Sequence, residues 1–126
     1  MIEEDYVSYK VARLLQEKGF DEVCFACYEY FISGVTLYQG WMFEYKGESV
    51  RNTDERVKCP TLQMAMKWLR VVHNLHITIY SCSQESWMYR ITKPHQKLED
   101  GEYGEDFNSY EDAASVAIKY CLTNLI

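Results

Sequence analysis

Apolar residues along the chain recur at two spacings, one typical of helices and the other typical of strands. The helical spacing marks three segments, and each begins with a hydroxyl residue four positions ahead of an alanine. These pairs are Ser8 and Ala12, Thr61 and Ala65, and Ser109 and Ala113. A hydroxyl oxygen at this place accepts a backbone N–H that has no partner inside the helix, so it is a common N-terminal cap. The pattern therefore predicts helices over residues 8–18, 62–73 and 110–124.

The second of these helices has the clearest amphipathic pattern. Its predicted buried stripe consists of Leu62, Ala65, Met66, Leu69 and Val72. Gly19 and Asn74 follow the last periodic residues of the first and second helices, and both residue types readily adopt the left-handed conformation that ends a helix. We expect Phe20 and Leu75, which come next, to fold back onto the helices that they follow.

Between the first two helices, apolar residues alternate with a period of two, which predicts a hairpin. Residues 22–32 form its first strand, Ser33-Gly34 forms the turn, and the second strand alternates from Val35 to Tyr45, with Gly40 as a candidate bulge. Both faces of residues 22–32 are largely apolar, which is typical of a central strand.

A second hairpin is predicted between the second and third helices, from residues 76–82 and 86–92. Its inward positions are Ile77, Ile79, Trp87, Tyr89 and Ile91. Polar stretches without a period follow both hairpins, at residues 46–59 and 93–108, and are expected to be long loops.

The order α-β-β-α-β-β-α predicts an α+β fold with a weak internal duplication. We expect a single domain over residues 1–126, with an antiparallel sheet of about four strands and the helices on one face. A chain of 126 residues with 48% hydrophobic residues can bury one continuous core.

The net charge of −6 disfavours nucleic acid as a partner, because phosphate backbones attract basic surfaces. No apolar run is long enough to cross a membrane, and the acidic N-terminus lacks the pattern of a secretory signal. The expected location is the cytoplasm, with no membrane partner.

Cysteine and histidine spacings raise two metal or redox hypotheses. Cys24-x-x-Cys27 has zinc or redox spacing, but it falls in a predicted strand, where positions three apart point to opposite faces. His73-x-x-His76 would need Cys59 or Cys82 to complete a metal site, and His73 has a simpler role at the negative end of its helix dipole. The prediction is that the cysteines are free thiols, most of them in the core, and that the protein holds no metal or cofactor.

The sequence contains no nucleophile elbow, phosphate loop, dinucleotide-binding glycine motif or His-Glu-x-x-His helix. The sequence therefore favours a protein that is not an enzyme. A catalytic site whose residues converge only in three dimensions stays open as an alternative.

Eleven tyrosines and three tryptophans are many for this length. Tyrosines in strands commonly belong to the core; the alternative is an exposed sheet face lined by Tyr28, Tyr30, Tyr38 and Tyr80. Such a face would suit a partner protein, since tyrosine gives a large contact area at a low entropy cost. An exposed sheet face or edge would also suit a second copy of the chain, so a homodimer is an expectation.

The same aromatic residues suit a small-molecule ligand as a second hypothesis. A nucleotide base would stack on a tyrosine ring, and its phosphates would contact basic residues. The candidate phosphate contacts are Arg51, Arg56, Lys58 and Arg90.

Three stretches resemble a group of small hypothetical proteins carried by gut anaerobes, their phages and their mobile elements. They lie at residues 6–9 with 14–20, at 60–70 with 72–77, and at 110–113 with 120–126, and include PTLQMAMKWLR and the ending YCLTNLI. The resemblance covers the three predicted helices and leaves the strands and loops divergent. The group has no assigned activity, so the resemblance implies a setting and no catalytic residue. It favours a non-enzymatic accessory protein that binds a host protein and interferes with a host defence or regulatory complex.

Overall fold

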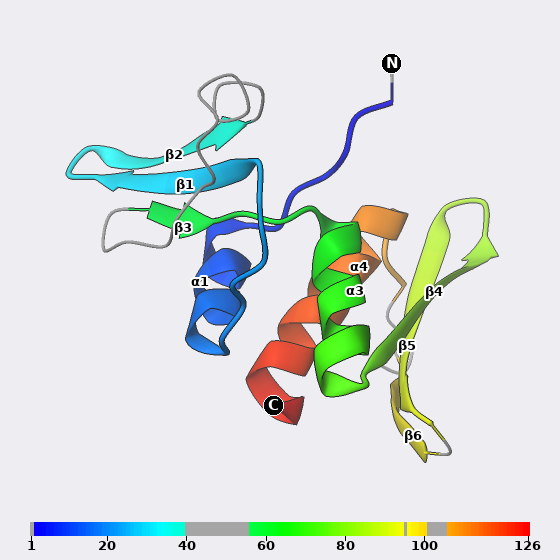
Figure 1. Ribbon diagram of the computed structural model, residues 1–126. Helices are drawn as coiled ribbons and strands as arrows, with labels where there is room; N and C mark the ends of the chain where they lie inside the picture. The colour runs from blue at the N-terminus through cyan, green and yellow to red at the C-terminus, as the bar shows by residue number, and fades with distance from the viewer. Residues whose placement is uncertain (1, 40–55, 95, 101–105) are drawn as a thin grey trace. The chain divides into compact units, whose positions relative to one another are not determined.

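Three α-helices, one π-helical turn and six strands are assigned in the computed structural model within residues 2–39, 56–94, 96–100 and 106–126, which are the residues that the structure describes. The chain divides into two compact units, Met1–Thr61 and Leu62–Ile126. Each unit contains one three-stranded antiparallel sheet and at least one helix (Figure 1), which confirms the predicted α+β class.

The first unit begins with α1 (Tyr9–Glu17), and both predicted ends of this helix are confirmed. Ser8 Oγ accepts a hydrogen bond from the backbone N–H of Val11 at 3.2 Å. At the other end Gly19 has a φ of 91°, which is strained for any residue with a Cβ. This conformation lets the Phe20 N–H donate to the Leu15 carbonyl at 2.9 Å, so that both side chains lie buried against the helix.

The sheet of the first unit consists of β1 (Ala26–Phe31), β2 (Gly34–Gln39) and β3 (Arg56–Lys58), in the order β2-β1-β3. The central place predicted for the first strand is confirmed, although the strand is shorter than residues 22–32. β3 lies in a stretch predicted to be a loop, and it was missed because three residues are too few to show a period. The predicted positions from Gly40 to Tyr45 lie outside the described residues.

The second unit begins with α3 (Leu62–His73). Four positions of the predicted stripe are buried, but Val72 is exposed and Trp68 is buried in its place. Asn74 has a φ of 57°, as its predicted role at the helix end requires. The N–H of Leu75 then donates to the Leu69 carbonyl at 3.0 Å, and the Leu75 side chain is buried.

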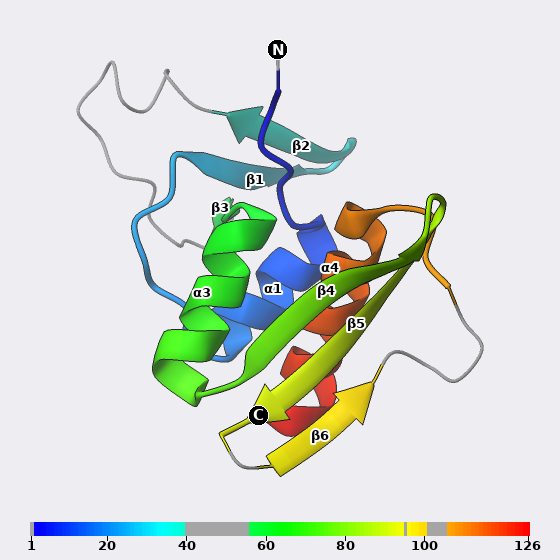
Figure 2. The same cartoon turned by 90° about the vertical axis from the view of Figure 1, so that its right-hand side faces the viewer.

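The second sheet consists of β4 (His76–Ser83), β5 (Ser86–Lys93) and β6 (Gln96–Asp100), in the order β4-β5-β6. α4 (Tyr110–Tyr120) packs against β4 and β5 and continues as a π-helical turn, η1 (Cys121–Leu125). Figure 2 looks onto this sheet, with α4 behind it. Among the predicted inward residues, Tyr89 and Ile91 are almost fully buried, which confirms the orientation of β5.

The arrangement of the strands differs from the expected sheet of about four. Two separate three-stranded sheets form, because each hairpin is extended by an additional strand, β3 or β6, rather than by the other hairpin. The predicted duplication appears as a repeated order of helix, hairpin and third strand. The sheet orders differ, because β3 pairs with the first strand of its hairpin and β6 with the second strand of its own.

Within the described residues, no helix is both long enough and apolar enough to cross a membrane.

Candidate functional site

The strand register divides the four candidate tyrosines. Residues directly opposite one another in an antiparallel pair have side chains on the same face. Tyr28 is opposite Leu37 and Tyr30 is opposite Val35, so these two tyrosines share a face of the first sheet.

Tyr38 and Tyr80 lie elsewhere. Tyr38 is opposite Cys27, whose side chain points to the face away from Tyr28, and Tyr80 belongs to β4 in the second sheet. The hypothesis of one face lined by all four tyrosines is therefore corrected. The sequence did not reveal this arrangement, because the face of Tyr38 depends on the register across the turn.

Tyr28 has a structural role. Its hydroxyl donates a hydrogen bond to the Val7 carbonyl at 2.7 Å, and its ring meets the Tyr9 ring edge-on, with 5.6 Å between centroids. Burial raises the pKa of Tyr28 to about 12. The side chain links β1 to α1 and to the segment before it, so its hydroxyl is already engaged within the first unit.

The turn end of the β1–β2 hairpin carries four exposed apolar or aromatic residues, which we call the hairpin end. Tyr30 is 57% exposed, Phe31 43%, Ile32 fully exposed and Val35 39%. Figure 1 shows this turn at the end of the hairpin away from α1. No charged residue occurs between Tyr30 and Gln39, in a chain with 25% charged residues. The hairpin end was not identified from the sequence. The signal was present, because residues beside a turn such as Ser33-Gly34 are usually polar and here they are apolar.

The basic candidates of the first sheet are already paired with carboxylates. Arg56 Nε lies 2.8 Å from Glu29 Oε1 across the β1–β3 pair. Lys58 Nζ lies 2.8 Å from Asp21 Oδ1. Arg51 lies outside the described residues. These contacts weaken the hypothesis that the first sheet offers its basic residues to phosphates.

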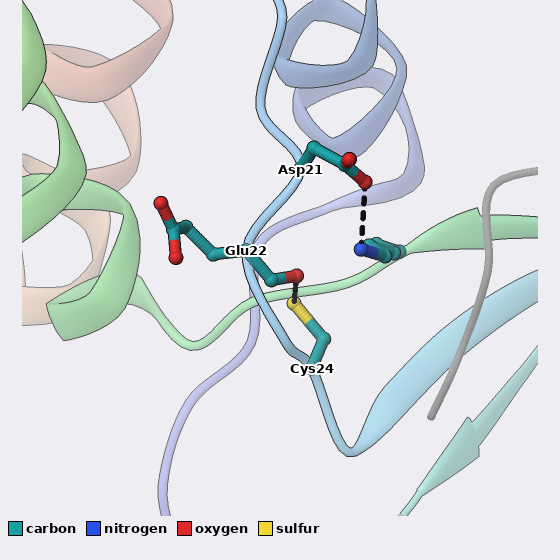
Figure 3. Close-up of polar contacts among 4 residues, drawn as sticks. Asp21, Glu22 and Cys24 are labelled. Atoms are coloured by element: carbon teal, nitrogen blue, oxygen red, sulfur yellow. Dashed lines mark hydrogen bonds and ion pairs between the residues drawn. The ribbon is translucent and has the colours of Figure 1, made fainter. Parts of the chain in front are cut away.

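Lys58 is the charged residue with the least exposure among those described, with 9% of its side chain exposed against 83% for Asp21. A buried ammonium requires a partner, because removing a lone charge from water is costly. The hydrogen bond and the charge of Lys58 lower the pKa of Asp21. Figure 3 shows the Asp21 carboxylate at this contact and the Glu22 side chain directed away from it. The ion pair ties the connection between α1 and β1 to β3.

The thiols of Cys24, Cys27 and Cys59 are buried and take part in no disulfide. Burial raises the pKa of Cys24 to about 11 and that of Cys59 to about 12, and it also raises the pKa of Cys27. The Cys24 Sγ donates to the Glu22 carbonyl at 3.6 Å (Figure 3). Because the thiolate is the reactive form, these protonated thiols are poor nucleophiles and poor metal ligands.

The two histidines of the metal hypothesis have separate surroundings. His73 is the last residue of α3, and its ring meets the Trp68 ring edge-on at 4.7 Å. His76 Nε2 lies 3.2 Å from Asn74 Oδ1. Within the described residues, no three histidine, cysteine, aspartate or glutamate side chains come together as a metal site.

In the second sheet, Tyr80 and Arg90 lie close together. The Arg90 guanidinium carbon is 5.6 Å from the centroid of the Tyr80 ring, which is within the range of a cation–π contact. Thr78 is opposite Arg90 and Met88 is opposite Tyr80, so all four side chains share the face away from Tyr89 and Ile91. One aromatic and one basic candidate are thus brought together.

Comparisons with known proteins give no relative: no family model, no curated protein and no solved structure matches the chain.

Proposed function

We propose that the protein is a non-enzymatic accessory protein that binds another protein through its hairpin end. The observation that carries this proposal is the exposure of Tyr30, Phe31, Ile32 and Val35 around one turn. Exposing apolar side chains to water is unfavourable, and contiguous exposed apolar groups commonly mark interaction sites.

The composition of the hairpin end suits a protein surface as its partner. Tyr30 and Phe31 are aromatic residues on opposite faces of β1, and Ile32 follows them in the turn. Aromatic anchors dominate many binding surfaces, because they bury a large area with few rotatable bonds. The absence of charge between Tyr30 and Gln39 removes the desolvation cost that a buried charge would add.

The setting implied by the helix sequences suggests the class of partner. If the protein comes from a phage or a mobile element, the expected partner is a host protein. Binding would then interfere with a host defence or regulatory complex.

The test compares two double variants in a tagged pull-down from host lysate, analysed by native mass spectrometry. Tyr30→Ser with Ile32→Ser removes exposed apolar surface from the hairpin end. Val71→Ser with Val72→Ser removes it from α3, where these valines are 70% and 54% exposed. We expect the hairpin variant to capture about tenfold less partner protein, which corresponds to a loss of about 1.4 kcal/mol in binding free energy. The α3 variant should capture as much as the wild-type protein.

Circular dichroism and thermal unfolding establish that both double variants fold. Equal capture by the wild-type protein and the hairpin variant would show that the hairpin end is not the contact surface. A wild-type protein that captures no partner would contradict the proposed protein binding.

Nucleotide binding is a second candidate function, and the Tyr80–Arg90 pair supports it. A base would stack beside Tyr80 and a phosphate would contact Arg90. Saturable binding should raise the unfolding midpoint in a thermal-shift screen against nucleoside mono-, di- and triphosphates. Arg90→Met should abolish that rise. A flat screen with the wild-type protein would leave protein binding as the better-supported function.

A further inference from the structure

We propose that the outer edge of β2 pairs with β2 of a second copy, which joins the two first sheets into one antiparallel sheet across a two-fold axis. The partner is thus the chain itself. This contact shares only Val35 with the hairpin end proposed above, and it stands whether or not the protein binds a host protein.

The hydrogen bonds of β1 show which groups of β2 face outward. The N–H of Cys59 donates to the Ala26 carbonyl at 3.0 Å, so the backbone of Ala26 faces β3. Backbone direction alternates along a strand, so Cys27, Glu29 and Phe31 face β2. Their partners in β2 are Tyr38, Thr36 and Gly34.

The remaining β2 residues therefore direct their backbone groups away from β1. These are Val35, Leu37 and Gln39. In the described part of the chain, no strand pairs with this edge. Three N–H groups and three carbonyl groups thus form a template for another strand.

Comparison with the other edge strands sets β2 apart. Natural sheets protect their edges with short strands, charged residues or bulges. β3 has only three residues and carries Arg56 and Lys58, and the pairing of β6 with β5 has a register irregularity between Ile91 and Thr92. β4 has a register irregularity between Ser81 and Ser83. β2 has six residues, with no charge, no proline and a continuous register.

The charge distribution permits a second copy as the occupant. Two chains with a net charge of −6 repel one another over most of their surface, and that repulsion is smallest where they meet through an uncharged strand. The ten residues from Tyr30 to Gln39, which include all of β2, are uncharged. A copy approaching along this edge meets no like charge on β2.

The length of β2 and the alternation of its backbone groups also allow it to pair with β2 of a second copy. An antiparallel pair that places Leu37 opposite Leu37 of the partner copy puts Val35 opposite the partner's Gln39. All three outward-facing residues of each strand then find hydrogen-bonding partners. A shift of two residues leaves one of the three without a partner, so the pairing centred on Leu37 is the best satisfied.

This register leads to a charge-exchange experiment at position 37. Leu37→Lys places two lysines directly opposite one another, and Leu37→Glu does the same with two glutamates. We expect analytical ultracentrifugation to show a dimer for the wild-type protein and an increase of at least about tenfold in the dissociation constant for either variant. An equimolar mixture of the two variants should form a heterodimer, since lysine then faces glutamate.

Thr36→Lys is the matched control. Thr36 is exposed, and in the proposed register it lies opposite Tyr38 of the partner copy, so two lysines do not meet. The dimer of this variant should persist. Far-UV circular dichroism checks that each variant folds.

Hydrogen exchange on the wild-type protein gives a measurement that does not depend on the variants. The N–H groups of Val35, Leu37 and Gln39 should become more protected as the protein concentration rises. A wild-type protein that stays monomeric at hundreds of micromolar would overturn the proposal. So would a dimer that neither charge variant weakens, or a mixture of the variants that forms no heterodimer.

Discussion

Leu69→Ala is expected to lower the free energy of unfolding by about 2–5 kcal/mol. Leu69 is fully buried on the inner side of α3, and its carbonyl accepts the N–H of Leu75 where the chain leaves the helix. The substitution removes buried methyl groups and leaves a cavity that a close-packed core fills only in part. Urea unfolding followed by circular dichroism measures the change.

Val71→Ala is the matched control, because Val71 lies two positions further along α3 with 70% of its surface exposed. Its expected effect is within about 0.5 kcal/mol, and alanine's better helix propensity favours the variant. If both variants lost a similar amount of unfolding free energy, the side of α3 that carries Leu69 would not be the side that faces the core.

The ends of the helices were predictable from the sequence because their signals are local. Ser8 and Ser109 accept backbone hydrogen bonds from residues three positions ahead. Gly19 and Asn74 adopt positive φ angles where the first and second helices end. Each of these contacts lies within a single turn, so one residue type at one place is sufficient to predict it.

The assembly of the strands was not predictable in the same way. β3 is a three-residue strand that pairs with the remote strand β1, and β6 is a polar strand that pairs with β5, which directly precedes it. Neither strand is both long enough and apolar enough to show an alternating hydrophobic pattern. Amino-acid periodicity therefore located the two hairpins but not the third strand of either sheet.

The candidate site shows the same limit. The tyrosines were identified as residues of the strands, but their faces depend on register, which separates Tyr38 from Tyr30. Arg56 and Lys58 were identified as bases, but their carboxylate partners lie 27 and 37 positions away in sequence. Only the structure shows that these charges are already used in holding the first unit together.

The buried thiols are expected to make the protein markedly less stable at alkaline pH. Burial raises the pKa of Cys59 and of Cys121 from an ordinary value of 9.0 to about 12. Above pH 9 these thiols ionise in the unfolded chain but stay protonated in the folded protein. The unfolded state therefore loses protons first, and the stability present below pH 9 is lost as the pH rises toward 12.

The size of this effect follows from the shifts in pKa. Between pH 8 and pH 10 each of the two thiols should reduce the free energy of unfolding by about 1–2 kcal/mol, or about 3 kcal/mol together. By pH 11 the combined loss reaches about 5 kcal/mol, which is comparable to the whole stability of many small domains. Cys24 and Cys27 add to the loss, because burial raises their pKa values too.

Urea unfolding at pH 8 and pH 10 tests this expectation. The double variant Cys59→Ala with Cys121→Ala should be less stable at pH 8, because it leaves small cavities, but its loss between the two pH values should be smaller by about 3 kcal/mol. Cys82→Ala, which changes an exposed thiol, is the matched control for the loss of a cysteine side chain. If the double variant loses as much stability as the wild-type protein, groups other than these two thiols cause the alkaline unfolding. The core would then admit enough water for Cys59 and Cys121 to ionise in the folded state.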